Sequence, residues 1–257
     1  MNSRIRDRRR AVGRQRGRRR AGLVFVFGLL VAAAVLFVWL RSSDVFAVRT
    51  VTATATERIA QEEVSRVASE AIGESLFRLS TADLEEALRS LPYVRSAEVY
   101  RRFPNTLDVR LEEYEPIARL KAGDGAVWVV ADNGRALEVV VPPAGAGLPL
   151  VVPSTDETPV AGQQVSEIVA QALPLAVIMA DESANRHLAS AKEIWVSPSG
   201  ALTIVLKEGA ELRLGDPTKL DQKLKGALQI IEQYLRDGTP LEYVDATVAD
   251  KLAVKAK

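Results

Sequence analysis

The chain has 257 residues, no cysteine, one histidine and a formal net charge of +1. The lack of cysteine excludes disulfides, thiolate catalysis and cysteine metal sites, and a lone His187 excludes histidine clusters. His187 lies in the polar segment 181–187, where we expect a surface loop. Phosphate-loop, GxSxG, HExxH and EF-hand patterns do not occur, so we expect no cofactor and no metal.

The first twenty residues are strongly basic, with ten arginines against a single acidic residue, Asp7. An uncharged apolar run, 21–40, follows at once. A helix rises about 1.5 Å per residue, so this run spans about 30 Å, the thickness of a bilayer's hydrocarbon core. We expect a cytoplasmic basic tail at 1–20 and a transmembrane helix at 21–41, because arginine-rich flanks stay inside. The remainder would then be extracytoplasmic.

The arginines nearest the apolar run are the residues that we expect to set this topology or to contact anionic lipid: Arg14, Arg16, Arg18, Arg19 and Arg20. A cleaved signal peptide is less favoured, since its core has only about 7–15 apolar residues. Here the run continues beyond the small residues 32–34. Basic arms can also bind nucleic acid. No aromatic residue interleaves these arginines, so we expect no nucleic-acid partner.

Beyond residue 20 the chain is mildly acidic, with 24 basic and 32 acidic side chains and a net charge of −8. Such a mixed surface chiefly keeps a domain soluble and points to no particular partner. The adjacent pairs Glu62/Glu63 and Glu85/Glu86 lie on predicted helices and point in different directions. We therefore expect solvated faces there rather than paired catalytic carboxylates.

The region 45–115 predicts the order β-α-α-β-β. Strands are expected at 45–53, 94–100 and 107–112, with a turn at 103–105 between the last two. Both helices have apolar residues at helical spacing, and the first should end at Gly73. Ser80 should cap the second helix and Pro92 should stop it. The expected inward residues are Val64, Val67, Ala68, Ala71 and Ile72 in the first helix, and Leu84, Ala87, Leu88 and Leu91 in the second.

The region 116–257 predicts a mixed or antiparallel β domain with flanking helices. A hairpin should turn at Asp132-Asn133-Gly134, because Asn-Gly readily adopts positive φ. A helix kinked by Pro174 is expected from Gln163 to Met179, and a later helix carries a leucine stripe from Leu220 to Leu235. Further strands are expected at 191–196, 202–206, 211–214, 241–245 and 252–255. The fold class is therefore α+β, with an N-terminal transmembrane helix.

Three motifs in this order are similar to those of a known family. They are Pro92-Tyr93-Val94 with Ala97 and Val99, then Arg102-Phe103-Pro104, then Glu113-Tyr114-Glu115-Pro116-Ile117-Ala118. Behind an arginine-flanked apolar run, they resemble the POTRA domain of the FtsQ/DivIB cell-division family. The resemblance implies a POTRA domain at 45–115 and the family's β domain at 116–257. These motifs describe packing, and no chemistry follows from them.

The resemblance also implies a function and a binding site. The protein would be a divisome scaffold at the septum that recruits FtsB-like and FtsL-like partners and links them to peptidoglycan synthesis. A partner would add a strand beside the last strand of the chain. The residues implied are Tyr243, Val244, Asp245, Leu252, Ala253, Val254 and Lys255. Many family members have an apolar residue and arginine after the equivalent of Asp245, whereas Ala246-Thr247 stand here, so that arginine's contacts cannot be carried over.

Two other functions remain alternatives. One is a membrane-anchored cell-wall enzyme that uses carboxylates, and the other is a POTRA-bearing translocation component. The second needs a β-barrel, which the residues after Pro116, with two helical patterns, do not supply. We expect an interaction protein without catalysis or a small-molecule substrate. Its single span would lie in the cytoplasmic membrane, with the N-terminus inside and the bulk outside.

Overall fold

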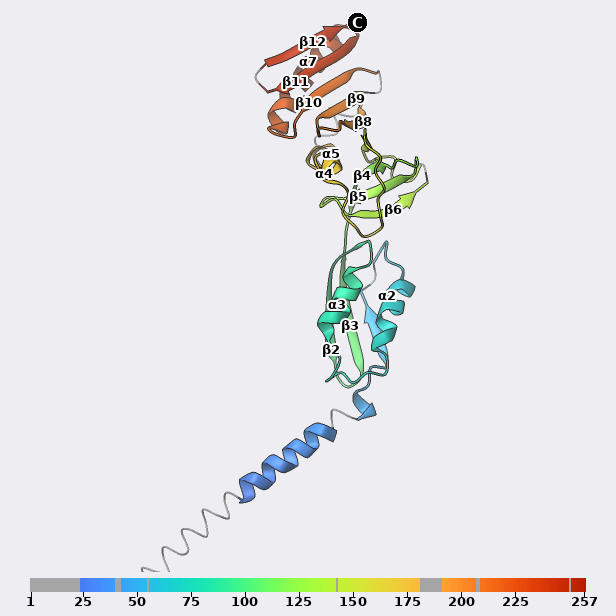
Figure 1. Ribbon diagram of the computed structural model, residues 1–257, viewed down its shortest axis with the longest axis vertical. Helices are drawn as coiled ribbons and strands as arrows, with labels where there is room; N and C mark the ends of the chain where they lie inside the picture. Colours follow the sequence, from blue (N-terminus) through green and yellow to red (C-terminus); the bar gives the residue numbers. More distant parts are fainter. Residues whose placement is uncertain are drawn as a thin grey trace, which may run out of the picture. The chain divides into compact units, whose positions relative to one another are not determined.

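The computed structural model describes residues 24–39, 43–54, 56–141, 143–180, 191–206, 209–249 and 251–257. The predicted tail 1–20 with its arginines, both ends of the predicted span 21–41, and His187 lie outside these ranges. Residues 24–39 form a helix, drawn in blue in Figure 1. Across the described ranges, no helix combines the length and the apolarity that crossing a membrane requires.

The described elements, labelled in Figure 1, confirm an α+β fold. In chain order they are η1 (Asp44–Phe46), β1 (Thr50–Ala53), α2 (Gln61–Ala68), η2 (Ser69–Ala71), α3 (Thr81–Arg89), β2 (Val94–Arg102), β3 (Thr106–Glu113), β4 (Pro116–Lys121), β5 (Val127–Ala131), β6 (Ala136–Val140), β7 (Leu150–Pro153), α4 (Glu167–Ala170), α5 (Leu173–Ala180), β8 (Ala191–Val196), β9 (Leu202–Leu206), β10 (Glu211–Gly215), α7 (Leu220–Arg236), β11 (Leu241–Val248) and β12 (Lys251–Ala256).

The chain divides into two compact units. Unit 1 draws on Met1–Ala55, Gln61–Glu85 and Glu98–Arg110, and unit 2 on Thr56–Ala60, Glu86–Ala97 and Leu111–Lys257. A three-stranded sheet has the order β1-β3-β2, and β1 runs parallel to β3. The buried side chains of unit 1 include Val64, Ala68, Leu76, Leu107 and Val109.

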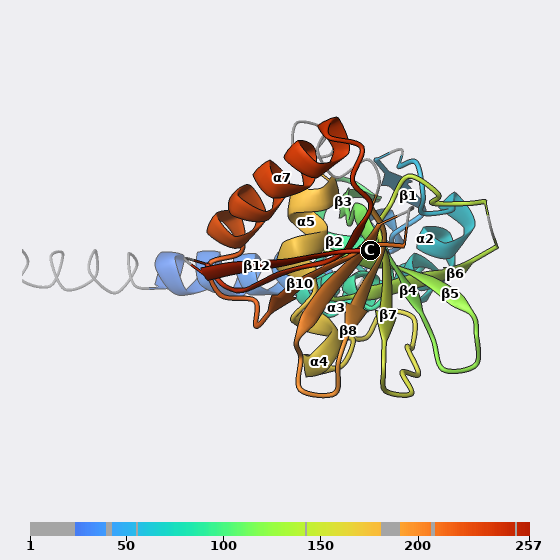
Figure 2. The same cartoon turned by 90° about the horizontal axis from the view of Figure 1, so that it is seen from above.

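A nine-stranded sheet lies in unit 2 and has the order β12-β11-β10-β9-β8-β7-β4-β5-β6. The pairs β4–β7, β7–β8 and β10–β11 are parallel, whereas the other pairs are antiparallel, so the predicted mixed sheet is confirmed. Helix α7 lies along one side of β10–β12, as Figure 2 shows.

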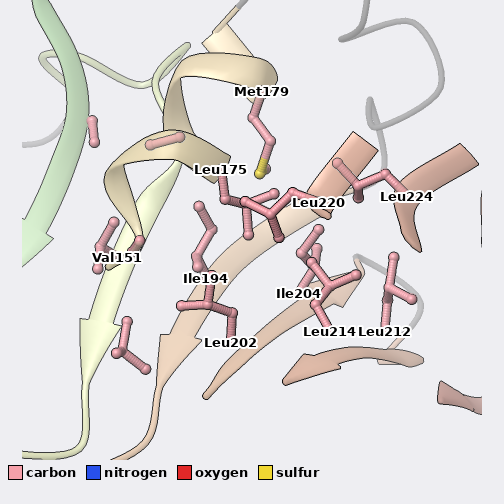
Figure 3. Close-up of a cluster of buried hydrophobic side chains, with 14 of the residues drawn as sticks. Val151, Leu175, Met179, Ile194, Leu202, Ile204, Leu212, Leu214, Leu220 and Leu224 are labelled. Carbon is pink, nitrogen blue, oxygen red and sulfur yellow. The ribbon is translucent and has the colours of Figure 1, made fainter. Parts of the chain in front are cut away.

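The core of unit 2 lies between this sheet and its helices. Figure 3 shows Leu175 and Met179 of α5 beside Ile194 and Leu202 of β8 and β9. The first turns of α7 bring Leu220 and Leu224 to Ile204, Leu212 and Leu214. Buried leucine and isoleucine side chains on alternate strand residues thus face the helices, and the intervening residues of each strand face the other side.

Four local predictions in unit 1 and α3 are wrong. The strand expected from Val45 begins only at Thr50, because Ser43 accepts the Val45 N–H at 3.4 Å and caps η1. Ile72 is exposed, since η2 ends before it and its backbone is extended. Ala87 lies on the exposed side of α3. Glu85 is half-buried and accepts the Val99 N–H at 2.9 Å, so it is not a solvated residue.

The helix predicted from Gln163 to Met179 is two short helices, α4 and α5. Ser166 caps α4, where its Oγ accepts the Val169 N–H at 3.4 Å. Pro174 stands in the first turn of α5 rather than at a kink. Proline fits a first turn well because its missing N–H would have no partner there. The Asn133-Gly134 turn is confirmed, and Gly134 has φ 89°.

Candidate partner-binding edge of the large sheet

Strand β12 forms one end of the nine-stranded sheet and pairs antiparallel with β11. The register places Lys255 opposite Tyr243, Val254 opposite Val244, and Ala253 opposite Asp245. All seven residues implied as partner-binding therefore lie on two neighbouring strands. Because successive backbone N–H groups of a strand point to opposite sides, one of any two consecutive residues in β12 directs its amide away from β11.

The two faces of β12 differ. Leu252 and Val254 are half-buried and pack against the core, whereas Ala253 and Lys255 are exposed. Gly226 of α7 permits this packing, since a Cβ there would stand only 2.9 Å from Leu252 Cδ1. The edge strand is thus fixed against α7 through one face and remains accessible through the other.

Tyr243 lies on the exposed side of the sheet between two cations. The guanidinium carbon of Arg213 is 4.2 Å from the centroid of its ring, and Lys255 Nζ is 6.0 Å away. The ring is half-buried. An aromatic ring held between cations keeps one orientation and still offers apolar surface, which suits a binding contact.

Ion pairs surround the tyrosine on the same side. Lys255 donates to Glu242 at 3.0 Å, and this hydrogen bond raises the pKa of Lys255. Arg213 donates to Glu211 at 2.8 Å, and that contact raises the pKa of the guanidinium. These pairs are solvent-exposed, so they orient the side chains more than they stabilise the fold.

Asp245 is tied to its own strand. The N–H and Oγ1 of Thr247 donate to Asp245 Oδ1 at 3.0 and 2.6 Å, and these bonds lower the pKa of Asp245. Thr247 occupies the position where the family resemblance leads one to expect arginine. Here the residue fixes a carboxylate within β11 and contributes no positive charge.

Sequence reasoning missed a buried lysine that links α7 to the end of β10. Lys223 of α7 is only 2% exposed, and its Nζ donates to Leu214 O, Asp216 O and Asp216 Oδ1 at 2.9, 2.9 and 2.8 Å. The last contact, together with Thr218, lowers the pKa of Asp216 to about 2. The position of Lys223 within the leucine stripe, between Leu220 and Leu224, could have indicated that this lysine is buried. This lysine fixes the start of α7 to the end of β10.

The structure thus gathers the seven residues, but not with equal access. The side chain of Val244 is buried and faces the core, so only its backbone is part of the edge. The five arginines near the predicted span lie outside the described residues. Within the described ranges, histidine, aspartate and glutamate side chains form no group of three or more that could hold a metal ion.

Comparison with known families finds two successive matches. Residues 46–114 match the family described as POTRA domain, FtsQ-type. Residues 118–246 match the family described as cell division protein FtsQ/DivIB, C-terminal, which includes most of β11 and ends before β12. The two matches follow one another along the chain in the order that the sequence motifs predict.

Curated relatives carry the same names. A cell division protein FtsQ of Myxococcus fulvus is 32% identical over 76% of this chain and 68% of its own length. An FtsQ of Burkholderia pseudomallei is 29% identical over 92% of this chain and 90% of its own. A DivIB of Bacillus anthracis is 26% identical over 74% and 68%.

Proposed function

Since the chain belongs to the FtsQ/DivIB family of cell-division proteins, we propose that it is a bitopic scaffold of the divisome. It recruits FtsB-like and FtsL-like partners at the division septum and helps control septal peptidoglycan synthesis. Its contribution is binding and placement, without catalysis, cofactor, nucleic acid or small-molecule substrate. The family membership supports the role in cell division.

The proposed organisation follows the chain from inside to outside. Residues 1–20 are the cytoplasmic tail, 21–41 the single span, 45–115 the POTRA domain and 116–257 the β domain. The described part of the proposed span is the helix at 24–39, whose large apolar side chains, Phe25 and Trp39 among them, are exposed. Apolar side chains exposed all along a helix are suited to lipid.

The observation that carries the proposed binding mode is the position of β12 at the end of the sheet. Edge strands offer backbone donors and acceptors to a further strand, and lysines restrict which strand can pair. Lys251 and Lys255 occupy this strand, and Tyr243 lies on the neighbouring one. A partner strand beside β12 would therefore be recognised through hydrogen bonds with the backbone of β12 and through a contact with the ring of Tyr243.

Proline substitutions test the strand addition. Proline removes an N–H donor, and an edge strand tolerates it only where that donor faces away from its neighbour. One of Ala253→Pro and Val254→Pro should leave residues 43–257 folded by circular dichroism and abolish capture of the FtsB-like partner in a pull-down. If both variants fold and still capture the partner, strand addition at β12 is wrong.

Replacement of Tyr243 by alanine tests the aromatic contact. We expect Tyr243→Ala to weaken capture by about 2 kcal/mol or more, as for an aromatic hot spot. Tyr100→Ala is a control, because Tyr100 is likewise a strand tyrosine with a cation near its ring: Arg110 lies 4.9 Å from the ring centroid. Equal losses in the two variants would show that Tyr243 has no special part in binding.

Protease protection tests the proposed topology. Protease added outside spheroplasts should digest residues 43–257 and spare a tag placed before Arg4. Replacing most of the ten arginines of the tail by glutamine should weaken this orientation, because positive charge sets it. The reverse pattern of protection would refute the orientation.

A further inference from the structure

Three phenylalanines from distant parts of unit 1 meet at its surface. The ring centroids of Phe46 and Phe77 are 5.1 Å apart, those of Phe77 and Phe103 5.3 Å, and those of Phe46 and Phe103 6.1 Å. The three rings come from η1, from the segment after η2, and from the turn between β2 and β3. We call them the phenylalanine cluster.

Backbone hydrogen bonds hold the three segments together. Leu76 N donates to Phe46 O at 2.8 Å, and Arg49 N donates to Asn105 O at 2.9 Å. An isolated bridge also joins Ala47 to Ser75. The backbone of unit 1 therefore brings the three rings together.

The cluster faces outward although its members are among the most apolar side chains. Phe77 is 41% exposed and Phe103 57%; Val45, next to Phe46 in the sequence, and Ile72, five positions before Phe77, are 53% and 55% exposed. Water disfavours apolar surface, so such side chains normally gather in a core. A cluster of exposed aromatic rings that the backbone holds in place indicates a contact surface.

Positive charge accompanies the cluster. Four exposed arginines lie close to the three rings in the sequence: Arg49 after η1, Arg78 next to Phe77, and Arg101 and Arg102 at the end of β2, just before Phe103. Arg101 donates to Leu79 O at 2.7 Å and Arg102 pairs with Asp108 at 2.8 Å, and Asp44 and Glu74 add acidic groups nearby. Aromatic rings with adjacent arginines match the boundary between acyl chains and anionic headgroups.

The chain itself keeps the cluster close to a bilayer, if the span proposed above holds. Phe46 follows Trp39, the last described residue of the N-terminal helix, by seven positions. Even a fully extended chain of that length reaches at most about 25 Å. The cluster can thus lie no farther than this from the end of the helix.

We propose that the phenylalanine cluster docks on the outer surface of the membrane that holds the span. The rings enter the interface, the arginines contact anionic headgroups, and unit 1 is thereby held at a defined orientation to the bilayer. The inference rests on the proposed membrane anchor. It favours lipid over a protein partner because the short connection delivers the cluster to lipid in every copy of the chain.

A fluorescent probe next to the cluster tests this in the full-length chain. The chain has no cysteine, so Glu74→Cys provides one labelling site beside the rings and Val160→Cys provides one in unit 2. Both variants are reconstituted in vesicles of phosphatidylethanolamine with a minority of phosphatidylglycerol, including a lipid with a nitroxide quencher on its headgroup. We expect strong quenching at position 74 and weak quenching at 160.

The control combines Glu74→Cys with Phe77→Ser and Phe103→Ser. The extra quenching at position 74 should then be lost, while the protein still floats with the vesicles. Quenching at 74 no stronger than at 160, or unchanged in the serine variant, overturns the proposal and leaves a protein partner as the occupant. Failure of the parent chain to float would instead refute the membrane anchor itself, so the two failures are distinguishable.

Discussion

The nine-stranded sheet has two edge strands, β6 and β12, whose surroundings differ sharply. At the β6 edge, Glu138 accepts the Tyr93 hydroxyl at 2.6 Å. The guanidinium of Arg135, the residue before β6, lies among the backbone carbonyls that follow helix α3 and donates to those of Arg89, Ser90, Leu91 and Pro92. At the β12 edge, by contrast, Lys255 pairs only one strand away, with exposed Glu242.

Position at an edge does not by itself make a strand available. Long-range hydrogen bonds hold the β6 edge to residues of unit 2 that are distant in sequence, and burial and the bond to Glu138 raise the pKa of Tyr93. The β12 edge is fixed from one face by α7 and keeps lysines on the other. Substitutions near β6 should therefore change stability, and substitutions on β12 should change binding.

The largest effect is expected in α3, close to the carbonyls that Arg135 binds. Leu88 is fully buried, so Leu88→Ala should lower the free energy of unfolding by about 2–5 kcal/mol. Urea unfolding of residues 43–257, followed through Trp128 and Trp195 of unit 2, measures it. The control is Glu86→Ala, at an exposed position of α3. Equal losses of stability in the two variants would mean that the buried and exposed faces of α3 are wrongly assigned.

Arg135→Ala should have the next largest effect. Its removal takes these donors from the carbonyls of residues 89–92, which are part-buried or exposed, and a typical hydrogen bond contributes about 0.5–1.5 kcal/mol. The same unfolding measurement applies, together with a pull-down of the FtsB-like partner. A variant that keeps its stability but loses the partner would contradict the division between the two edges.

Acid should weaken the contacts that link the start of α7 to the end of β10. The contacts of Asp216 with Lys223 and Thr218 lower its pKa to about 2 in the folded protein. This stabilisation is complete above the ordinary carboxyl pKa of about 4 and is lost as the pH falls through about 2. The stability difference between the parent and Asp216→Asn should therefore shrink between these values, and a constant difference would exclude this coupling.

The smallest effect on stability is expected on β12 itself. Lys255→Gln removes an exposed ion pair with Glu242, and such pairs contribute about 0–1 kcal/mol. Unfolding of the variant should match that of the parent closely. A large loss of stability would mean that Lys255 holds β12 in place, in addition to restricting which strand can pair with it.

Periodicity and turn chemistry predicted most of the elements in the sequence. The Ser80 cap is confirmed, since Asp83 N donates to Ser80 Oγ at 3.3 Å, and α7 buries Leu220 and Leu224 of the expected leucine stripe. The errors came at element ends, in the sides of α3 on which Glu85 and Ala87 lie, and in the helix expected at 163–179, which is two helices. The spacing predicted that Ile72 lies on the apolar face of a helix, but the 3-10 helix η2 ends at Ala71, one residue before it. Apolar spacing alone does not show where a helix ends.

The candidate site was predictable only in part. Family resemblance pointed to Tyr243 and the last strand, and the register then placed Lys255 opposite that ring. The cation over the ring comes from Arg213 on β10, thirty positions earlier in the chain. Such contacts, like those of Lys223 with the end of β10, depend on strand order, which residue patterns do not specify.

Amide hydrogen exchange with and without the FtsB-like partner tests most directly whether β12 is the edge that accepts a strand. We predict that the partner slows exchange within residues 251–256, because the outward amides of β12 gain hydrogen-bond acceptors, and leaves residues 136–140 of β6 unchanged. A bound partner that leaves β12 unprotected, or protects β6 instead, would contradict the account.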